Sequence, residues 1–207
     1  MATSDVQAPI LESGDRLTRA EFHELYCQRP DIKKAELVEG VVYVASPVRF
    51  RAHGQPLLYV NTWLGAYMAK TPGVLAGTDA TVLLDPDNEV QPDAVLWREQ
   101  PGSAYLTEDD YLEGAPQLVV EVAASSASYD LHDKLRAYER NGVQEYIVWR
   151  VLNETIDWFH LEDGRYVRVE PDAHGVIESE VFPGLRLNVE KMLASDVAGV
   201  LAELETP

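Results

Sequence analysis

The sequence predicts a mixed α/β (α+β) fold built around one sheet, and two observations lead to this class. Stretches that alternate apolar and polar residues, or form short apolar runs, are typical of strands. Between them lie stretches whose apolar residues recur every three or four positions, which is typical of helices. The chain has 207 residues, 46% of them hydrophobic, so it is long enough to bury one sizeable core.

The domain organisation follows from where these patterns begin. Residues 1–15 are polar and without a period, so we expect a flexible N-terminal tail. Residues 16–207 carry no internal repeat and no low-complexity tract. We expect them to form a single domain.

A short helix and a hairpin are predicted first. Thr18 followed by Glu21 fits a capping box, and the helix that it opens is closed by Pro30. Residues 35–46 alternate on both sides of a central Glu-Gly pair, which is suited to a tight turn. The sequence therefore predicts an N-terminal β-hairpin.

A long helix and several short strands are predicted for the middle of the chain. Residues 52–70 carry an apolar stripe at helical spacing, formed by Leu57, Val60, Leu64 and Tyr67. Short strands are expected at residues 73–77, 80–84 and 93–97. The stretches between and after them are expected to be turns and one long loop, at residues 85–92 and 98–116.

The C-terminal half repeats the strand-and-helix order. A buried strand at residues 118–124 precedes a helix at about residues 130–141, and Gly142 is placed to cap that helix in a left-handed conformation. Further strands are expected at residues 145–151, 155–161 and 166–170, and a closing helix at residues 189–204.

Composition limits the partners and the location. Thirty-five acids against 17 bases give a net charge of −18, which repels nucleic acid unless a basic strip or a bound divalent cation inverts the local sign. No apolar run has the length of a membrane span and no export signal is visible, so a cytoplasmic protein is expected. The single cysteine, Cys27, cannot form an internal disulfide, and structural zinc is not expected.

Glu121 interrupts an apolar strand. Alternation places Leu118, Val120 and Val122 on one face, and Val119, Glu121 and Ala123 on the other. An ionised carboxylate buried without a partner is costly, so Glu121 should face a cation, a metal or hydrogen-bond donors. A structural salt bridge is the alternative to a functional role.

Asp93 opens the apolar strand at residues 94–97, directly after Pro92. Taken alone, it can be a turn or capping residue. Neighbouring strands of a sheet lie about 4.8 Å apart, so Asp93 and Glu121 on adjacent strands could share one divalent cation.

Lys134 falls within the inward stripe of the predicted helix, which Leu131, Leu135 and Tyr138 define. Its ammonium group is therefore aimed at the sheet, although a lysine whose head reaches back to water is the alternative. Two carboxylates that hold Mg²⁺ or Mn²⁺, with a lysine that orients or helps to deprotonate a water, suit hydrolysis of a phosphodiester.

Three segments together carry a resemblance to a known family. QPDAVLW, LVVEVAASSASYDLHDKLRAYERNGVQEYIVW and the upstream AELVEGVVYVASPVRFRAHG are similar to the Uma2 family of restriction-endonuclease-like proteins, a branch of the PD-(D/E)XK nuclease superfamily. The resemblance extends over roughly residues 18–190. It implies a restriction-endonuclease-like mixed central sheet with flanking helices and a metal-dependent nuclease site.

The resemblance also implies roles for individual residues. Asp93 and Glu121 match the acidic residues of the family. Most of the superfamily has its lysine two residues after the glutamate, where this chain has Ala123; in Uma2-like sequences the lysine stands on the following helix, where Lys134 is found.

Three further residues match the family pattern. Glu36 matches the glutamate of the hairpin and could complete the metal ligands. His53 matches a family histidine, and a lone histidine near the start of a helix is otherwise a structural or capping residue. Asp130, four residues before Lys134, is a candidate for orienting the lysine.

Three functions compete on this evidence. The first is a Mg²⁺- or Mn²⁺-dependent endonuclease that hydrolyses DNA, with a homodimer as the commonest oligomeric arrangement. The second is a non-catalytic binding or assembly protein that retains the fold, with Glu121 and Lys134 as a structural ion pair, and the net charge of −18 favours it. The third is a hydrolase that uses paired carboxylates as glycosidases do. The inward lysine has no required role in that chemistry.

Overall fold

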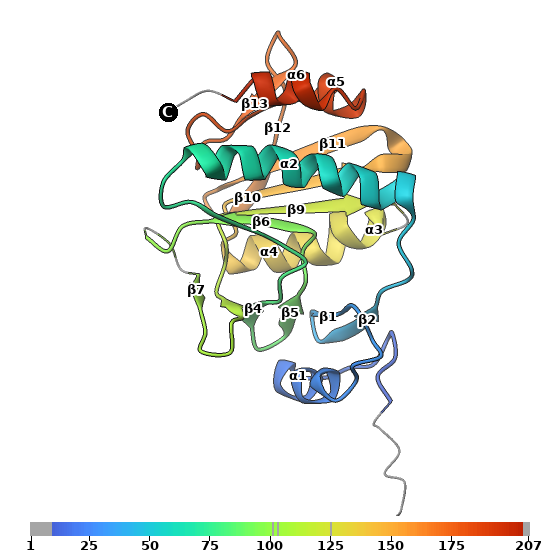
Figure 1. Cartoon of the computed structure of the whole chain (residues 1–207). Coiled ribbons are helices and arrows are strands. Elements are labelled where there is room, and N and C mark those ends of the chain that lie inside the picture. The colour runs from blue at the N-terminus through green and yellow to red at the C-terminus, as the bar shows by residue number, and fades with distance from the viewer. Residues whose placement is uncertain (1–9, 101, 103, 125, 205–207) are drawn as a thin grey trace, which may run out of the picture.

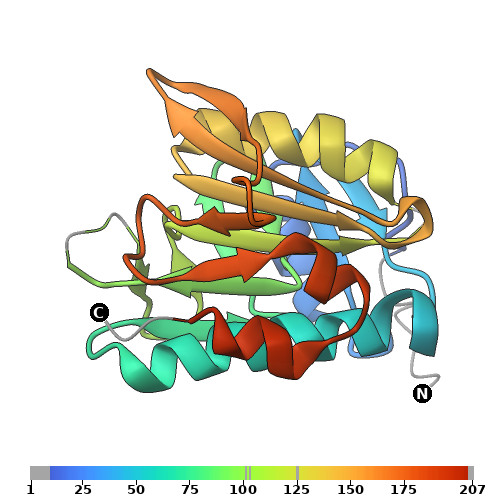
Figure 2. The same cartoon turned by 90° about the horizontal axis from the view of Figure 1, so that it is seen from above.

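The structure is a computed structural model that describes residues 10–100, 102, 104–124 and 126–204. Helices cover both faces of a central six-stranded sheet (Figure 1). On one face lies α2 (Gln55–Lys70), with two C-terminal helices beside it; on the other lies the helical segment that ends in α4 (Leu135–Asn141) (Figure 2). The predicted mixed class with flanking helices is confirmed.

The central sheet has the order β12-β11-β10-β9-β6-β3. Strands β9 and β10 are parallel, and the other neighbours are antiparallel. Its strands, in chain order, are β3 (Leu75–Thr78), β6 (Ala94–Trp97), β9 (Leu118–Ala123), β10 (Glu145–Arg150), β11 (Thr155–Glu162) and β12 (Arg165–Val169). Each lies within two residues of its predicted position.

The two faces of β9 are those that alternation predicted. Leu118, Val120 and Val122 pack in the core beneath α2, whereas Val119 and Ala123 pack in the core that includes Tyr138 of α4. Glu121 therefore points toward the α4 side. A one-residue change of register would exchange these faces, so burial on both sides fixes the strand.

A second six-stranded sheet corrects the expectation of one sheet. Its order is β2-β1-β5-β4-β8-β7, and it contains β1 (Ala35–Val38), β2 (Val41–Val44), β4 (Val82–Asp85), β5 (Asn88–Val90), β7 (Tyr105–Leu106) and β8 (Leu112–Glu113). The hairpin β1–β2 is confirmed, and its turn residues Glu39 and Gly40 have φ of 53° and 72°. The turns predicted at 85–92 contain β5, and the loop predicted at 98–116 contains β7 and β8. These strands of two or three residues are too short for a period to show.

The first helix, α1 (Arg19–Cys27), packs against this second sheet. Its predicted capping box is present: the Thr18 hydroxyl accepts from the Glu21 amide, and the Glu21 carboxylate accepts from the Thr18 amide at 2.8 Å. Residues 1–9 of the predicted tail lie outside the described residues. Residues 10–15 correct the tail prediction, because Leu11 is buried and the Gly14 amide donates to the Val42 carbonyl at 2.9 Å.

Two π-helical turns precede regular helix. The first, η1 (Phe50–Gly54), leads into α2. The second, η2 (Asp130–Lys134), lies between α3 (Ala127–Tyr129) and α4, so the helical segment starts three residues earlier than predicted. Gly142 ends it with φ of 81°, as predicted. Such wide turns are frequent at functional sites.

The closing helix predicted at 189–204 is two helices, α5 (Val189–Leu193) and α6 (Val197–Ala202). The helix is interrupted at Ser195, whose φ is 63°. Asp196 caps the second helix, because its carboxylate accepts a hydrogen bond from the Gly199 amide. A two-stranded sheet of β13 (Val176–Glu178) and β14 (Arg186–Asn188), absent from the prediction, precedes them. No helix in the described part of the chain is long and apolar enough to cross a membrane. We keep the single domain of residues 16–207 as a proposal.

Candidate active site

Charged side chains gather where β1, β6 and β9 meet the η2 turn. We call this group the acid–lysine cluster; it consists of Lys34, Glu36, Asp93, Glu121, Asp130 and Lys134. All except Lys34 are buried. Residues from three distant parts of the sequence therefore share one site with very little access to water.

The register of β6 and β9 brings Asp93 and Glu121 together. Ala94 pairs with Val120, so the next position sets Asp93 opposite Glu121. One carboxylate oxygen of Asp93, Oδ2, accepts from the Val122 amide at 2.8 Å. Asp93 thus continues the contact between the two strands one residue before β6 begins.

Lys134 reaches into the cluster from the helix. Its Nζ lies 2.7 Å from Oε1 of Glu121 and 2.7 Å from Oε1 of Glu36, and the side chain is 3% exposed. The Tyr138 hydroxyl donates to the same Glu121 oxygen at 3.1 Å. The ammonium group is therefore held inside the protein, and does not reach back to water as the alternative interpretation required.

Glu36 links the second sheet to the central one. It lies on β1, and its Oε1 accepts from the Gln91 amide at 2.8 Å in addition to its contact with Lys134. Glu36 is therefore linked to Glu121 through the shared ammonium group of Lys134.

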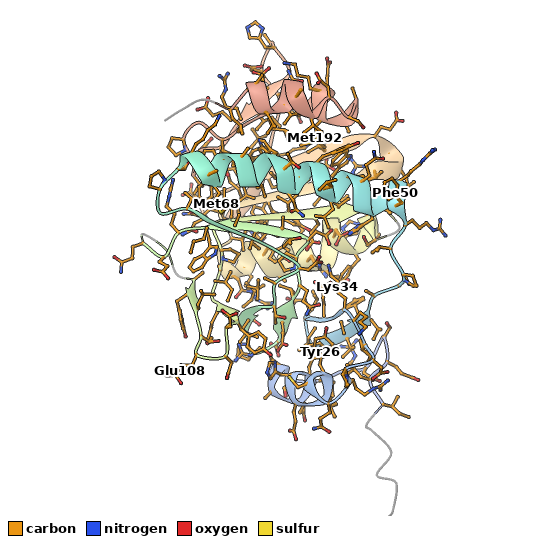
Figure 3. The ribbon with its side chains drawn as sticks, in the orientation of Figure 1. Tyr26, Lys34, Phe50, Met68, Glu108 and Met192 are labelled. Carbon is orange, nitrogen blue, oxygen red and sulfur yellow. The ribbon has the colours of Figure 1, made fainter. Side chains whose placement is uncertain are left out.

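Lys34 is a member of the cluster that sequence reasoning missed. Its Nζ donates to Oδ1 of Asp93 at 2.9 Å and to Oδ1 of Asp79 at 3.1 Å (labelled in Figure 3). Residues two apart on a strand share a face. The position of Lys34 two residues before Glu36 is the signal that could have found it.

His53 lies beside Asp93. It belongs to the η1 turn, and its Nδ1 is 2.9 Å from the Val122 carbonyl, so Nδ1 carries a proton. Its Nε2 is 3.5 Å from Oδ1 of Asp93. The structure therefore brings this candidate to the edge of the site.

Asp130 is buried but makes no direct ion pair with Lys134. Burial raises the pKa of its carboxyl, while the charge of Lys134 opposes that rise. Beside it, the ring of Tyr129 lies 5.5 Å from Nζ of Lys134, a cation–π contact. The Tyr129 hydroxyl is buried and has no hydrogen-bond partner among the described residues.

Charge is unbalanced inside the cluster, because four carboxylates face two ammonium groups. Burial raises the pKa of Glu121 to about 8; Lys134 lowers it, and the charges of Asp93, Asp130 and Glu36 add to the rise. Burial lowers the pKa of Lys134, yet the surrounding carboxylates outweigh that effect and hold it well above its usual value. The pKa of Lys34 is raised for the same reason. A further positive charge would be stabilised here.

The donor set suits a hard divalent cation. Mg²⁺ is commonly held by one or two carboxylates, with water and substrate phosphate completing its shell. The Oε2 atoms of Glu36 and Glu121 receive no hydrogen bond from the residues that the structure describes. Within those same residues no three His, Cys, Asp or Glu side chains converge as one metal-binding group, so a metal here would depend on one or two carboxylates together with water and phosphate.

Comparison with known proteins gives one family and one fold. The sequence profile of Uma2, described as "Putative restriction endonuclease", matches residues 19–190. The structure is similar to the crystal structure of "a putative nuclease belonging to DUF820 from Anabaena variabilis ATCC 29413", with a TM-score of 0.61 and 12% identity over 77% of this chain and 89% of that one. No curated protein matches the sequence. The family match spans most of the chain, and the chain therefore belongs to the Uma2 family of restriction-endonuclease-like nucleases.

Proposed function

We propose that this protein is a metal-dependent endonuclease that hydrolyses phosphodiester bonds in DNA with Mg²⁺ or Mn²⁺. One observation carries the proposal: Asp93 and Glu121 lie opposite each other on neighbouring strands, with the buried ammonium group of Lys134 2.7 Å from Glu121. Two carboxylates and a lysine are the side chains that cleavage of a phosphodiester can use.

Asp93 and Glu121 are the residues that would hold the metal, Glu121 through its free Oε2 and Asp93 through Oδ1, for which Lys34 competes. Glu36 is the third candidate, because its Oε2 is also free. When bound, the metal would lower the pKa of a coordinated water and neutralise charge that develops on the phosphate. The excess of carboxylates in the cluster supports this assignment, since a divalent cation would balance it.

Lys134 acts as a fixed cation. Because neighbouring carboxylates hold its pKa well above the usual value, it stays protonated at neutral pH and is not suited to accept a proton from water. Its role is to orient the nucleophilic water and to neutralise the transition state. The sequence alone allows this lysine either to orient the water or to help deprotonate it, and the raised pKa favours orientation.

The acidic residues are not evenly spread along the sequence. This weakens the main argument against a DNA substrate, which is the net charge of −18. Residues 40–78 contain no Asp or Glu, although they include Arg49, Arg51 and Lys70. This segment contains η1 and α2 and passes beside the site at His53 (Figure 1). A phosphate backbone that approaches along this segment meets Arg49 and Arg51, while the nearby exposed acids Asp79 and Glu154 come from other segments.

A binding or assembly protein remains the second candidate. The observation that favours it is that Lys134 already pairs with both Glu36 and Glu121. An ion pair of this kind can be purely structural.

Titration with Mn²⁺ by calorimetry tests the metal site. We expect the parent protein to bind Mn²⁺ and the variants Asp93→Asn and Glu121→Gln to lose at least tenfold in affinity, about 1.4 kcal/mol. Glu99→Gln, which removes an exposed acid, serves as the matched control and should leave affinity unchanged. Absence of binding in the parent, or equal binding in all four proteins, would favour the second candidate.

Hydrolysis is tested with single-stranded, duplex and branched DNA in the presence of Mg²⁺ or Mn²⁺. We expect Lys134→Ala to lower the rate by about 10²-fold or more, as removal of one charge-stabilising donor does elsewhere. Cleavage that survives this change would remove Lys134 from the mechanism. No cleavage of any substrate by a parent that binds metal would count against the nuclease assignment.

A further inference from the structure

The second sheet carries charged side chains on both of its faces. On β1, Glu36 points toward the acid–lysine cluster, whereas its neighbour Leu37 points the other way and packs with Phe22 of α1. Glu89, on β5, is the antiparallel partner of Leu37, so its side chain lies on that second face. A carboxylate is therefore buried beneath α1, across the sheet from the acid–lysine cluster.

A histidine of α1 holds this carboxylate. Glu89 is 2% exposed, and its two oxygens lie 2.9 and 3.1 Å from Nδ1 of His23. An ionised carboxylate only accepts hydrogen bonds, so Nδ1 carries a proton and Nε2 keeps its lone pair. Burial raises the pKa of Glu89, while the hydrogen bond from His23 and the charges of His23 and Arg19 lower it in part. Positive charge on the imidazole therefore stabilises the ionised carboxylate.

The other nitrogen of the imidazole faces a thiol. Nε2 of His23 lies 3.6 Å from Sγ of Cys27, one helical turn further along α1, and Cys27 is exposed. The ring of Tyr111 lies edge-on to the imidazole at 5.2 Å, and its side chain forms a hydrogen bond with Cys27. We call Cys27, His23 and Glu89 the thiol row. A nucleophile, a base and a group that orients the base, in this order, are the arrangement that activates a nucleophile.

A cavity of about 280 Å³ lies beside the thiol row. All three members of the row line it, and Tyr26, Gln91 and Tyr111 add further polar groups. Tyr26 is labelled at α1 in Figure 3. A small molecule can therefore reach the sulfur within a polar hollow, as well as from open solvent.

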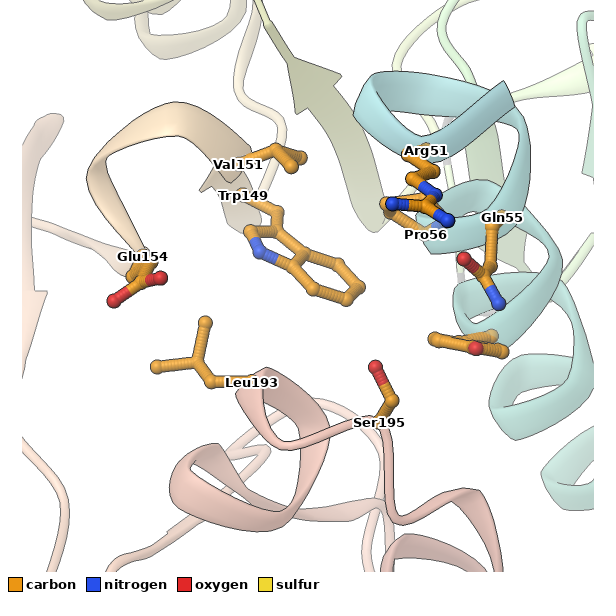
Figure 4. Close-up of a pocket in the computed structure, with 9 residues that line it drawn as sticks. Arg51, Gln55, Pro56, Trp149, Val151, Glu154, Leu193 and Ser195 are labelled. Carbon is orange, nitrogen blue, oxygen red and sulfur yellow. The ribbon is translucent and has the colours of Figure 1, made fainter. Parts of the chain in front are cut away.

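A second cavity provides a contrast. It has a volume of about 190 Å³ and lies between α2, the end of β10 and the link between α5 and α6 (Figure 4). Its central indole, that of Trp149, packs in the core beneath α2 and is only 5% exposed. Among the described residues that line it there is no histidine or cysteine. It therefore lacks the paired nucleophile and base that the cavity at Cys27 has.

The thiol row is arranged for proton transfer and not for a metal. Cysteine, histidine and glutamate can all ligate metals, but here the imidazole lies between the sulfur and the carboxylate and uses a different nitrogen for each. The three groups do not converge on one point. In the part of the chain that the structure describes, no three His, Cys, Asp or Glu side chains form a metal-binding group.

We infer that Cys27 is a reactive thiol, activated by His23 and Glu89, that a hydroperoxide oxidises to a sulfenic acid. A peroxide is small and uncharged, so the net charge of −18 does not repel it. Exposed, activated thiols are the ones that peroxides oxidise. Cys27 is the only cysteine, so the sulfenic acid cannot form an internal disulfide and can condense only with a thiol of another molecule. The inference is separate from the proposed nuclease function.

The reaction balances with the groups of the row and one peroxide, ROOH. Nε2 of His23 takes the thiol proton, and the sulfur attacks the terminal oxygen of the peroxide. The O–O bond breaks, its electron pair leaves on RO⁻, and RO⁻ takes the proton from Nε2. The products are the sulfenic acid of Cys27 and ROH, so the sulfur loses two electrons and the peroxide gains them. Glu89 stabilises the imidazolium that exists between the two proton transfers.

The reactivity of Cys27 can be measured directly, because every thiol signal of the full chain comes from this residue. Hydrogen peroxide is added at neutral pH, the loss of free thiol is followed with time, and the sulfenic acid is trapped with dimedone and identified by mass spectrometry. A peptide of residues 24–30, which has the cysteine without the rest of the row, is the reference. A free cysteine is only a few per cent thiolate at neutral pH, so we expect the protein to react about tenfold faster or more. A rate no higher than that of the peptide would overturn the inference.

The variant His23→Gln tests the base. It should lower the rate constant to that of the peptide, because no group is left to take the thiol proton. The side chain of His23 is 35% exposed, so the variant should keep the fold, which circular dichroism checks. His132→Gln removes an exposed histidine elsewhere and is the matched control, with no expected change. A His23→Gln protein that reacts as fast as the parent would overturn the inference.

Glu89 is a positioning residue, because it acts on the sulfur only through His23. Glu89→Gln keeps an acceptor for Nδ1 but removes the charge, so it should lose most of the acceleration. Glu89→Asp keeps the charge and should regain part of it, whereas Glu24→Gln, which removes an exposed acid from the same helix, should react like the parent. Equal losses in both Glu89 variants, or no loss in either, would overturn the role of Glu89. These measurements need neither metal nor DNA, so their outcome does not depend on the nuclease proposal.

Discussion

The ammonium nitrogen of Lys134 lies 2.7 Å from Oε1 of Glu121, across 13 residues of sequence and from a helix rather than from the strand of Glu121 itself. The strand position that would otherwise carry the lysine is Ala123, which is completely buried against the core on the α4 side. A lysine at that position would have to displace packed apolar groups. The helix supplies the same charge without disturbing the strand.

Replacement of Lys134 by Met is expected to destabilise the protein by about 3–5 kcal/mol, because Glu36 and Glu121 would be left buried without their cation. Urea unfolding at neutral pH measures the change. Lys70→Met, at an exposed site in α2, is the control and should stay within about 0.5 kcal/mol. The double variant Lys134→Met with Glu121→Gln should regain part of the loss. A loss no larger than that of the control would show that the pair contributes little.

Replacement of Lys34 by Ala is expected to change two properties in opposite directions. Asp93 loses the cation that competes for its Oδ1, so Mn²⁺ should bind about tenfold more tightly, while affinity for DNA should fall. Calorimetry with Mn²⁺ and fluorescence anisotropy with labelled duplex DNA measure the two effects. Lys33→Ala removes the neighbouring, exposed ammonium group and should leave Mn²⁺ affinity unchanged. Weaker Mn²⁺ binding in Lys34→Ala would contradict the expectation.

Two glycines at the helical segments should respond oppositely to alanine. Gly142 has φ of 81°, where an L side chain is strained, so Gly142→Ala should cost about 1–2 kcal/mol. Gly54 has right-handed helical angles, so Gly54→Ala should be neutral or stabilising by up to about 1 kcal/mol. A methyl group at either position meets no atom within 4 Å, so urea unfolding reports the backbone alone. Equal effects would refute this account of how α4 ends.

Glu145 should make stability depend on pH. Burial raises the pKa of its carboxyl, while hydrogen bonds from the Ser179 hydroxyl and the Glu180 amide lower it in part. A carboxyl with a raised pKa binds its proton more tightly in the folded state. Its contribution is therefore full below the unfolded pKa of about 4.3 and is lost as pH rises through the folded value.

The variant Glu145→Gln isolates this effect. The unfolding free energy of the parent minus that of the variant should decrease as pH rises above about 4.3, superimposed on a constant difference from the lost acceptor. Glu162→Gln, at an exposed position on β11, should show no such trend. Urea unfolding at a series of pH values measures both, and a difference that is flat with pH would count against the raised pKa.

The parts of the fold that sequence could predict are those with a period. The alternation in β9 and the stripe on α2 were readable because each buries a continuous face over six or more residues. β5, β7 and β8 have two or three residues each, and their positions depend on partners far away in the chain. No local pattern records such pairing.

The candidate site was predictable to a similar degree. Asp93, Glu121 and Lys134 were singled out because each breaks an apolar pattern, and the structure brings all three together. Lys34 breaks no pattern, since it lies in a polar stretch before a strand, and its contact with Asp93 exists only in the folded chain.

At the two π-helical turns, the number of residues matters for the site as much as the identity of those residues. Among the described residues both such turns carry members or neighbours of the site, with His53 in one and Lys134 in the other. Each residue of an α-helix turns the chain by about 100°. Deleting one residue from the second turn would therefore rotate the two ends of the helical segment against each other, so that Asp130 and Lys134 could no longer face the sheet together. A variant can keep every charged residue of the cluster and still lose the site through a shift of one position.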